Sequence, residues 1–205
     1  EGSLDGYGLA ARLSYFLTSG PPDSELMVAA ADGSILRESV LKQHAIRLID
    51  SKASKTFIRS FLDQWLDLAA LEDLTPDKTL FDKPREFKYT DDERSAFIEE
   101  PNMFFREMLD TNRPMEDFID PDFTYTNVSV GKNVYELPMK GLSKKDKKLQ
   151  RVSFERGGRF GGVLGMAGVM TATANGVDTQ PVVRGVWVLE NILGNPPPPP
   201  PDAVP

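Results

Sequence analysis

Hydrophobic residues recur at helical spacing through the first third of the chain. The spacing predicts four helices joined by short turns, over residues 7–17, 24–31, 34–50 and 54–68. Asp23 or Ser24 can cap the second of these helices, and Ser34 the third. Such a run of short-linked helices is typical of an α bundle.

Aromatic residues mark the side of the fourth helix that we expect to be buried. Phe57, Phe61 and Trp65 share one helical face. A helix of this composition has to cover its aromatic stripe, so we expect these residues to pack with Leu13 and Phe16 in one core.

The middle of the chain alternates one strong helix signal with irregular connections. Thr90 and Glu93 form a capping box at the start of a helix that runs to about Asp110, with Pro101 inside it. Pro114 begins a short helix that ends near Ile119. Irregular or extended segments are expected over residues 72–89, 120–133 and 140–151.

The last part of the chain predicts two apolar helices and a spacer. The helices cover residues 161–173 and 181–193, and Gly194 with Asn195 ends the second. The prolines of residues 196–201 favour a stiff polyproline II spacer of roughly 19 Å, at about 3.1 Å per residue.

These elements predict a mainly α protein with a multi-helix, bundle-like domain, irregular connections and a C-terminal polyproline spacer. We expect a helical domain over residues 1–140 and a connecting loop with the helices that open the next module over 141–195. A proline-rich linker follows over 196–205.

Composition excludes several classes of function. The net charge of −7 argues against a nucleic-acid binder, because phosphate binding requires a basic surface. The chain has no cysteine, so it cannot form a disulfide or a thiolate metal site. No apolar run approaches the roughly 18 residues that span a bilayer, and no signal peptide is visible. We expect the chain to be a segment of a longer protein that continues beyond both of its ends.

Few residues suggest chemistry. His44 is the only histidine and lies between Leu41 and Leu48, so it is read either as a ligand or as a packed core residue. The glycine-rich residues 156–165 match neither a phosphate loop nor a dinucleotide loop, and favour close helix packing. Four aspartates, Asp110, Asp117, Asp120 and Asp122, lie close together in the sequence without the spacing of a calcium loop.

Four separated motifs carry a family resemblance, and they occur in the same order as in that family. They are residues 9–17 (LAARLSYFL), 61–66 (FLDQWL), 156–158 (RGG) and 179–190 (TQPVVRGVWVLE), the last running into the prolines. The chain resembles planctomycete-type cytochrome-c-associated proteins, large exported chains built from domains of unknown function. It departs from the usual pattern over residues 127–142, where a longer helix would be typical.

The resemblance implies a non-catalytic helical scaffold that positions a downstream electron-transfer module. It also implies an extracytoplasmic location, with neighbouring domains of the same chain as partners and other proteins as possible partners. Haem c is expected in the longer chain but not in this one, which lacks the C-x-x-C-H attachment motif. Two alternatives stay open: a carboxylate hydrolase acting on a polymer through residues such as Glu99, Glu100 or Asp120, and a protein-interaction module.

The sequence offers no catalytic, cofactor-binding or metal-binding residue. Candidates for structural or partner contacts come from the last two motifs and are Arg156, Gly157, Gly158, Thr179, Pro181, Arg184, Gly185 and Trp187. We expect Arg184 to reach a carboxylate or carbonyl groups on a neighbouring segment, since a cation near the start of a helix is disfavoured by the helix dipole.

Overall fold

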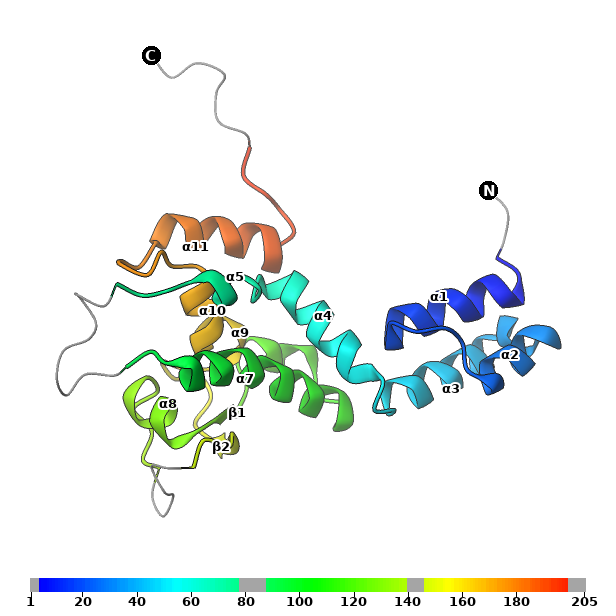
Figure 1. Ribbon diagram of the computed structural model, residues 1–205, viewed down its shortest axis with the longest axis horizontal. Coiled ribbons are helices and arrows are strands. Elements are labelled where there is room, and N and C mark those ends of the chain that lie inside the picture. The colour runs from blue at the N-terminus through cyan, green and yellow to red at the C-terminus, as the bar shows by residue number, and fades with distance from the viewer. Residues whose placement is uncertain (1–3, 78–87, 140–145, 199–205) are drawn as a thin grey trace. The chain divides into compact units, whose positions relative to one another are not determined.

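The chain folds as a mainly α protein, as the sequence predicts (Figure 1). The computed structural model describes residues 4–77, 88–139 and 146–198. Contacts divide the chain into two compact units, of which the first ends at Phe61 and the second begins at Leu62. The division falls inside helix α4 (Ser54–Leu66).

The first unit contains short helices around a small apolar core. Its elements are α1 (Gly6–Thr18), α2 (Ser24–Ala31), the 3-10 turn η1 (Ser34–Leu36), α3 (Glu38–Ile49) and the first turns of α4. Asp5 and Asp23 cap α1 and α2 by accepting hydrogen bonds from backbone N–H groups. The core consists of Ala10, Leu17, Leu26, Ala29, Ala30, Ile35 and Leu48.

The predicted cap at Ser34 is wrong. The Asp32 side chain accepts a hydrogen bond from the Ser34 N–H at 2.8 Å, and Gly33 adopts φ +73°. This turn leads into η1, so Ser34 starts a 3-10 turn and α3 begins four residues later, at Glu38. The local hydrogen bond of an aspartate side chain competes here with a longer helix.

The aromatic stripe of α4 is divided between the two units. Phe57 packs on Phe16 with ring centroids 5.2 Å apart, as expected, although Phe16 remains 64% exposed. Trp65 belongs to the second unit, where its ring packs edge-on against Phe118 at 5.4 Å. The prediction of one core for the whole stripe is therefore wrong, because α4 continues past the end of the first unit.

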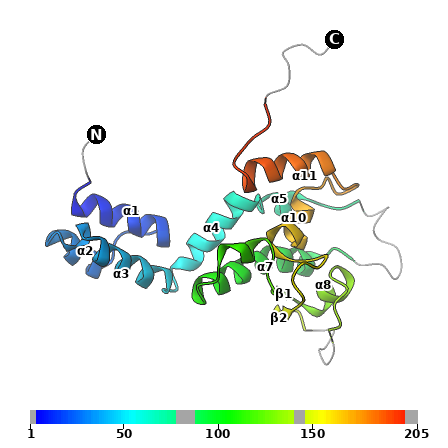
Figure 2. The ribbon, with the colours of Figure 1, turned by 180° about the vertical axis from the view of Figure 1, so that it is seen from behind.

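The second unit is built around the long helix α7 (Asp91–Asp110). In sequence order its other elements are α5 (Ala70–Asp73), η2 (Met115–Phe118), β1 (Phe123–Thr126), α8 (Val128–Asn133), β2 (Gln150–Ser153), α9 (Gly162–Gly165), α10 (Ala167–Ala172), α11 (Pro181–Trp187) and the π-helical turn η3 (Val188–Ile192). Helix α7 contacts α5, α8, α10 and β1, and Figures 1 and 2 show these elements gathered around it.

Helix α7 begins and packs as its sequence requires. The predicted capping box is present: the Thr90 backbone N–H donates to the Glu93 carboxylate, and the Thr90 hydroxyl accepts from the first turn. Pro101 lies within the helix and has no N–H to donate to the Phe97 carbonyl. Gly168 of α10 packs directly on that carbonyl, since a Cβ at position 168 would lie 2.4 Å from the oxygen.

A two-stranded sheet and a short helix occupy the region expected to be irregular. Strands β1 and β2 pair antiparallel, with Phe123 opposite Ser153. Helix α8 follows β1 directly because the Asn127 side chain accepts from the Val130 N–H at 2.9 Å and caps it. Neither the pairing nor α8 was specifically predicted, and residues 78–87 and 140–145 of the expected connections lie outside the described residues.

The single helix predicted over residues 161–173 is two short helices. Met166, with ψ 135°, separates α9 from α10. The N–H of Ala167, which opens α10, donates to the hydroxyl of Tyr135 at 2.8 Å rather than to a preceding turn. The predicted role of the glycines in close packing is seen at Gly162, where a Cβ would lie 2.3 Å from the Phe118 carbonyl oxygen.

Two helical glycines should respond in opposite directions to the same substitution. Gly168→Ala should lower the free energy of unfolding by about 1–3 kcal/mol, because the new Cβ meets the backbone of α7. Gly185→Ala in α11 should raise it by about 0.5–1 kcal/mol, because a Cβ there meets no atom within 4 Å and alanine favours helix. Urea denaturation followed by tryptophan fluorescence measures both, since Trp65 and Trp187 belong to the second unit. Equal effects would contradict the packing argument.

Candidate functional site

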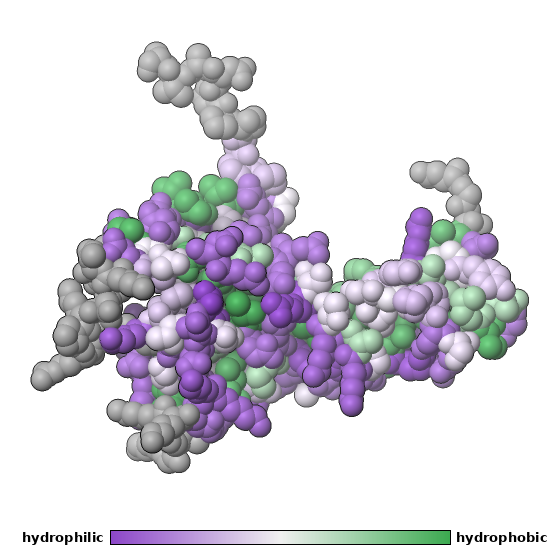
Figure 3. Space-filling view, viewed as in Figure 1, coloured by the Kyte–Doolittle hydropathy of each residue, from purple (hydrophilic) through white to green (hydrophobic). Residues whose placement is uncertain are grey.

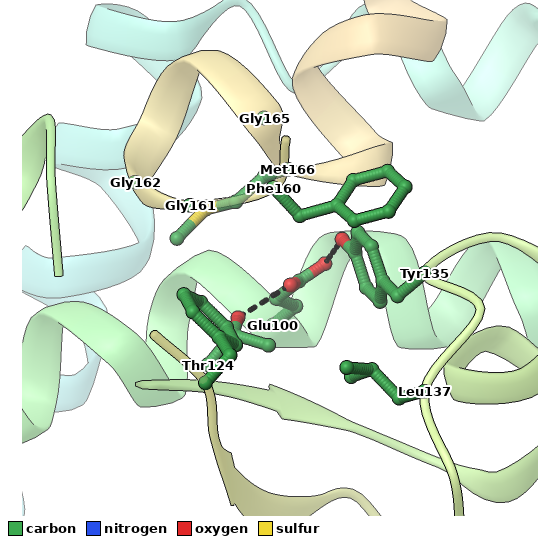
Figure 4. Close-up of a pocket in the computed structure, with 10 residues that line it drawn as sticks. Glu100, Thr124, Tyr135, Leu137, Phe160, Gly161, Gly162, Gly165 and Met166 are labelled. Carbon is green, nitrogen blue, oxygen red and sulfur yellow. Dashed lines mark hydrogen bonds between the residues drawn. The ribbon is translucent and has the colours of Figure 1, made fainter. Parts of the chain in front are cut away.

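A buried carboxyl group lies at the centre of the second unit. Glu100 of α7 is 2% exposed. Its Oε1 accepts from the Thr124 hydroxyl at 2.6 Å, and its Oε2 accepts from the Tyr135 hydroxyl at 2.6 Å (Figure 4). The Tyr135 oxygen in turn accepts from the Ala167 N–H. The cluster therefore joins α7, β1, the segment after α8 and the start of α10.

Burial controls the protonation of this cluster. Loss of water raises the pKa of Glu100 to about 7, although the hydrogen bonds from Thr124 and Tyr135 act in the opposite direction. Burial, together with the nearby Glu100 carboxyl, raises the pKa of Tyr135 well above its ordinary value, so that hydroxyl remains a hydrogen-bond donor.

The space beside Glu100 suits a structural role better than catalysis. The cavity measures about 10 Å³, which is room for about one water molecule. Its described lining includes Leu137, Phe154, Phe160, Met166 and glycines, but no second carboxylate (Figure 4). Glu99 is exposed on α7, and Asp120 accepts a backbone N–H elsewhere, so the carboxylates named for a hydrolase do not share this cavity.

The arginine and first glycine of the RGG motif bind the acidic loop that follows η2. Arg156 donates to Asp117 Oδ1 at 2.6 Å and to the Asp120 carbonyl. The Gly157 N–H, at φ +71°, donates to Asp120 Oδ1 at 2.6 Å. Gly158 is exposed next to them. Two of the acidic residues considered for calcium thus accept hydrogen bonds from this motif.

Asp117 is the buried member of this arginine–aspartate cluster. It is 1% exposed and accepts from Arg113 as well as from Arg156. Burial acts to raise the pKa of Asp117, but the hydrogen bonds and charges of the two arginines outweigh it and hold the pKa below its ordinary value. The carboxylate therefore stays ionised and tied to the two arginines.

The candidates of the last motif lie on and before α11. Thr179 pairs with Ala174 in an isolated antiparallel bridge, and Pro181 is the first residue of the helix. Gly185 is exposed. Trp187 is 6% exposed, and within the described part of the chain its Nε1 has no hydrogen-bond partner.

Helix α11 and turn η3 are attached to the rest of the second unit near both ends. Arg184 donates from Nε to the Thr173 hydroxyl and from Nη2 to the Met170 carbonyl, both at 3.1 Å, so it reaches a carbonyl group as predicted. At the other end, Trp65 Nε1 donates to the Asn191 carbonyl at 2.7 Å. Asn191 Nδ2 donates back to the Trp65 carbonyl at 2.6 Å.

Two protein families match the sequence. The family described as PSD4, protein of unknown function (DUF1592), matches residues 4–137, which is more than half of the chain. The chain belongs to this family. PSCyt3, protein of unknown function (DUF1588), matches residues 160–205. Both are planctomycete cytochrome-c-associated domain families, as the resemblance indicates, and no curated protein or solved structure matches the chain.

The residues of this PSD4-family chain do not fit a covalently bound haem. Haem c attachment requires two cysteines, and the chain has none. His44 is 7% exposed in the first unit, with Nδ1 3.4 Å from Arg47 Nη2 and 3.7 Å from Glu25. Among the described residues, no group of three or more His, Cys, Asp or Glu could hold a metal ion. None of the helices described is long and apolar enough to cross a membrane.

Sequence reasoning missed the partners that define these sites. The sequence indicates Glu100 only as one of several candidate carboxylates, and it does not indicate Thr124, Tyr135 or Asn191 as partners. The burial of Glu100 can be predicted from the sequence, because Glu100 shares a face of α7 with the buried Phe97 and Phe104. The partners come from segments 24 and 35 residues away, and no local pattern indicates them.

Glu100 should make the PSD4-family chain less stable as pH rises. Its pKa is about 7 in the folded state and close to the ordinary 4.5 when unfolded. Between these values only the unfolded state loses the proton, so stability falls from about pH 4.5 to pH 7 and levels off above. Glu100→Gln cannot titrate, so its stability relative to the parent should rise across this interval, by on the order of 3 kcal/mol. Urea denaturation at several pH values measures this.

Glu99→Gln is the matched control for this measurement. Glu99 is the adjacent carboxylate and is exposed, so its substitution should leave the pH dependence of the parent unchanged. A Glu100→Gln variant with the same pH dependence as the parent would contradict the assignment.

Proposed function

We propose that this chain is a non-catalytic helical scaffold of a larger exported cytochrome-c-type protein, and that it positions a downstream electron-transfer module. The observation that carries the proposal is the reciprocal pair of hydrogen bonds between Trp65 and Asn191. They hold the helix end that directly precedes the prolines.

A fixed helix end gives the spacer a defined starting point. The backbone leaves η3 at Gly194, with φ +60°, and the Asn195 N–H donates to the Leu189 carbonyl at 2.8 Å. Pro196 follows at once. Six prolines in polyproline II conformation would extend roughly 19 Å with little bending, and residues 199–205 of this expected spacer lie outside the described residues. A module attached to it would be held at a restricted distance from the second unit.

The proposed domain division supports the same reading. We divide the protein into a helical domain over residues 1–140, a connection with the opening helices of the next module over 141–195, and a linker over 196–205. The PSD4 match ends at residue 137 and the PSCyt3 match begins at residue 160, which supports a boundary between them. The compact units divide the chain elsewhere, inside α4.

The proposed location, cofactor and partners rest on the names of the two matching families. Association with cytochrome c supports an extracytoplasmic location and haem c in the longer chain, attached outside these residues. The partners would be neighbouring domains of the same chain.

A protein-interaction module is the second candidate, and α11 favours it. Val182 is 79% exposed and Val183 is 51% exposed. Figure 3 shows hydrophobic side chains gathered over this helix. Exposed apolar side chains grouped on one helix are typical of a contact surface. No comparable observation favours the hydrolase, because the cavity beside Glu100 holds about one water molecule.

Asn191→Ala tests the positioning role. Loss of its side-chain hydrogen bond should speed amide exchange at Leu193 and Asn195 by roughly five- to thirtyfold, for a bond worth about 1–2 kcal/mol. Asn133→Ala, at an exposed asparagine of α8, is the matched control and should leave exchange there unchanged.

The same variants then test the module in the longer protein. A fluorophore is attached to the cysteine of a Glu116→Cys variant, and the haem of the module quenches it. The distribution of fluorescence lifetimes then reports the distance between the fluorophore and the module. Asn191→Ala should broaden this distribution and Asn133→Ala should not. Faster exchange without broadening would reject the positioning role. The longer protein should also show a Soret band that the present chain lacks, and a longer protein without that band would reject haem c.

A further inference from the structure

A cavity of about 560 Å³ lies in the second unit between α7, α10 and α11. Its volume is in the range of small-molecule sites, roughly 300–1,000 Å³. The apolar part of its described lining includes Leu74, Pro76, Phe97, Val134, Met170 and Val177. Neither the cytochrome-c association of the families nor the proposed scaffold requires a cavity of this size.

One wall of this cavity is held by backbone contacts. The Asp77 N–H donates to the Gly176 carbonyl at 2.9 Å, and Gly176 packs against the Thr75 carbonyl. Ala174 and Thr179 pair across the same loop. A ligand that binds against this wall does not first have to order the loop of residues 174–179.

Arg184 supplies a positive charge to the cavity. Its Nε and Nη2 groups donate to Thr173 and Met170, which fixes the guanidinium in place. In the part of the chain that the structure describes, Arg184 forms no ion pair. Asp178 also lines the cavity but is exposed, and it does not pair with Arg184. The Nη1 hydrogens therefore remain for an external acceptor.

Tyr89 also lines the same cavity. Its hydroxyl is buried, and within the described residues it makes no hydrogen bond. Burial raises the pKa of Tyr89, so the hydroxyl keeps its proton. Because this oxygen is shielded from solvent, Tyr89 belongs to the wall, and Arg184 remains the positively charged group that lines the cavity.

We propose that this cavity binds a small carboxylic acid with an apolar body, as its carboxylate. The carboxylate would accept from Arg184, and the hydrocarbon part would lie against the apolar walls. A neutral apolar ligand would remove water from the guanidinium without replacing it, and a cation would meet the arginine charge. The charge and the lining thus favour an amphipathic anion over both.

The test uses three probes that share one hydrocarbon chain: octanoate, octan-1-ol and octylamine. Each is titrated into the full chain, and binding is followed by the amide chemical shifts of residues 170–179. Octanoate should shift these signals saturably and bind about tenfold or more tightly than the alcohol, since hydrogen bonds to a charged group are worth about 1.5–3 kcal/mol. Octylamine should bind most weakly. No saturable binding, or equal affinity for acid and alcohol, overturns the proposal.

Variants locate the binding and separate charge from folding. Ala174→Phe fills the cavity and should weaken octanoate by about tenfold or more. Arg184→Gln should remove the preference for acid over alcohol, while Arg184→Lys should retain part of it even if α11 loosens. Arg159→Gln removes an arginine whose side chain is 74% exposed outside the cavity and should change nothing. An Arg159→Gln effect as large as that of Arg184→Gln, or unchanged binding in Ala174→Phe, overturns the proposal.

Discussion

The buried carboxyl of Glu100 is the constraint around which the second unit is arranged. A carboxyl that is 2% exposed needs hydrogen bonds, because nothing else replaces the water it has lost. Thr124 and Tyr135 supply them, and Tyr135 also accepts from the start of α10. Four segments that are distant in sequence are thereby brought to one point. The break between α9 and α10 follows from this, because the first N–H of α10 donates to the tyrosine hydroxyl.

Hydrophobic spacing and capping residues predict most of the helices. Where a helix boundary is predicted wrongly, another contact of the same residues accounts for the error. Asp23 and Thr90 cap their helices as expected, since a cap requires only the next three residues. Ser34 fails as a cap because Asp32 binds its N–H first. The β1–β2 pairing joins residues 24 to 30 positions apart, and no pattern along the chain sets that register.

The sequence indicates individual residues of the candidate sites, but it does not indicate which residues contact each other there. The sequence indicates Arg184 and Arg156 as structural contacts, and each donates to main-chain carbonyls, which carry no sequence signature. Glu99 and Glu100 are identical in type and adjacent, so only the rotation of α7 separates an exposed carboxylate from a buried one. The role of Asn191 depends on Trp65, 126 residues earlier, and is beyond any local reading.

Arg184 connects the proposed scaffold with the proposed ligand. Its two hydrogen bonds attach α11 to α10 and the residue after it, and the same residue lines the cavity. A carboxylate bound at Nη1 would add an acceptor without displacing Met170 or Thr173, because those bonds use Nε and Nη2. Occupancy would therefore restrict α11 further rather than release it. Since η3 and the prolines continue from α11, any ordering of the helix by a ligand would extend to the start of the spacer.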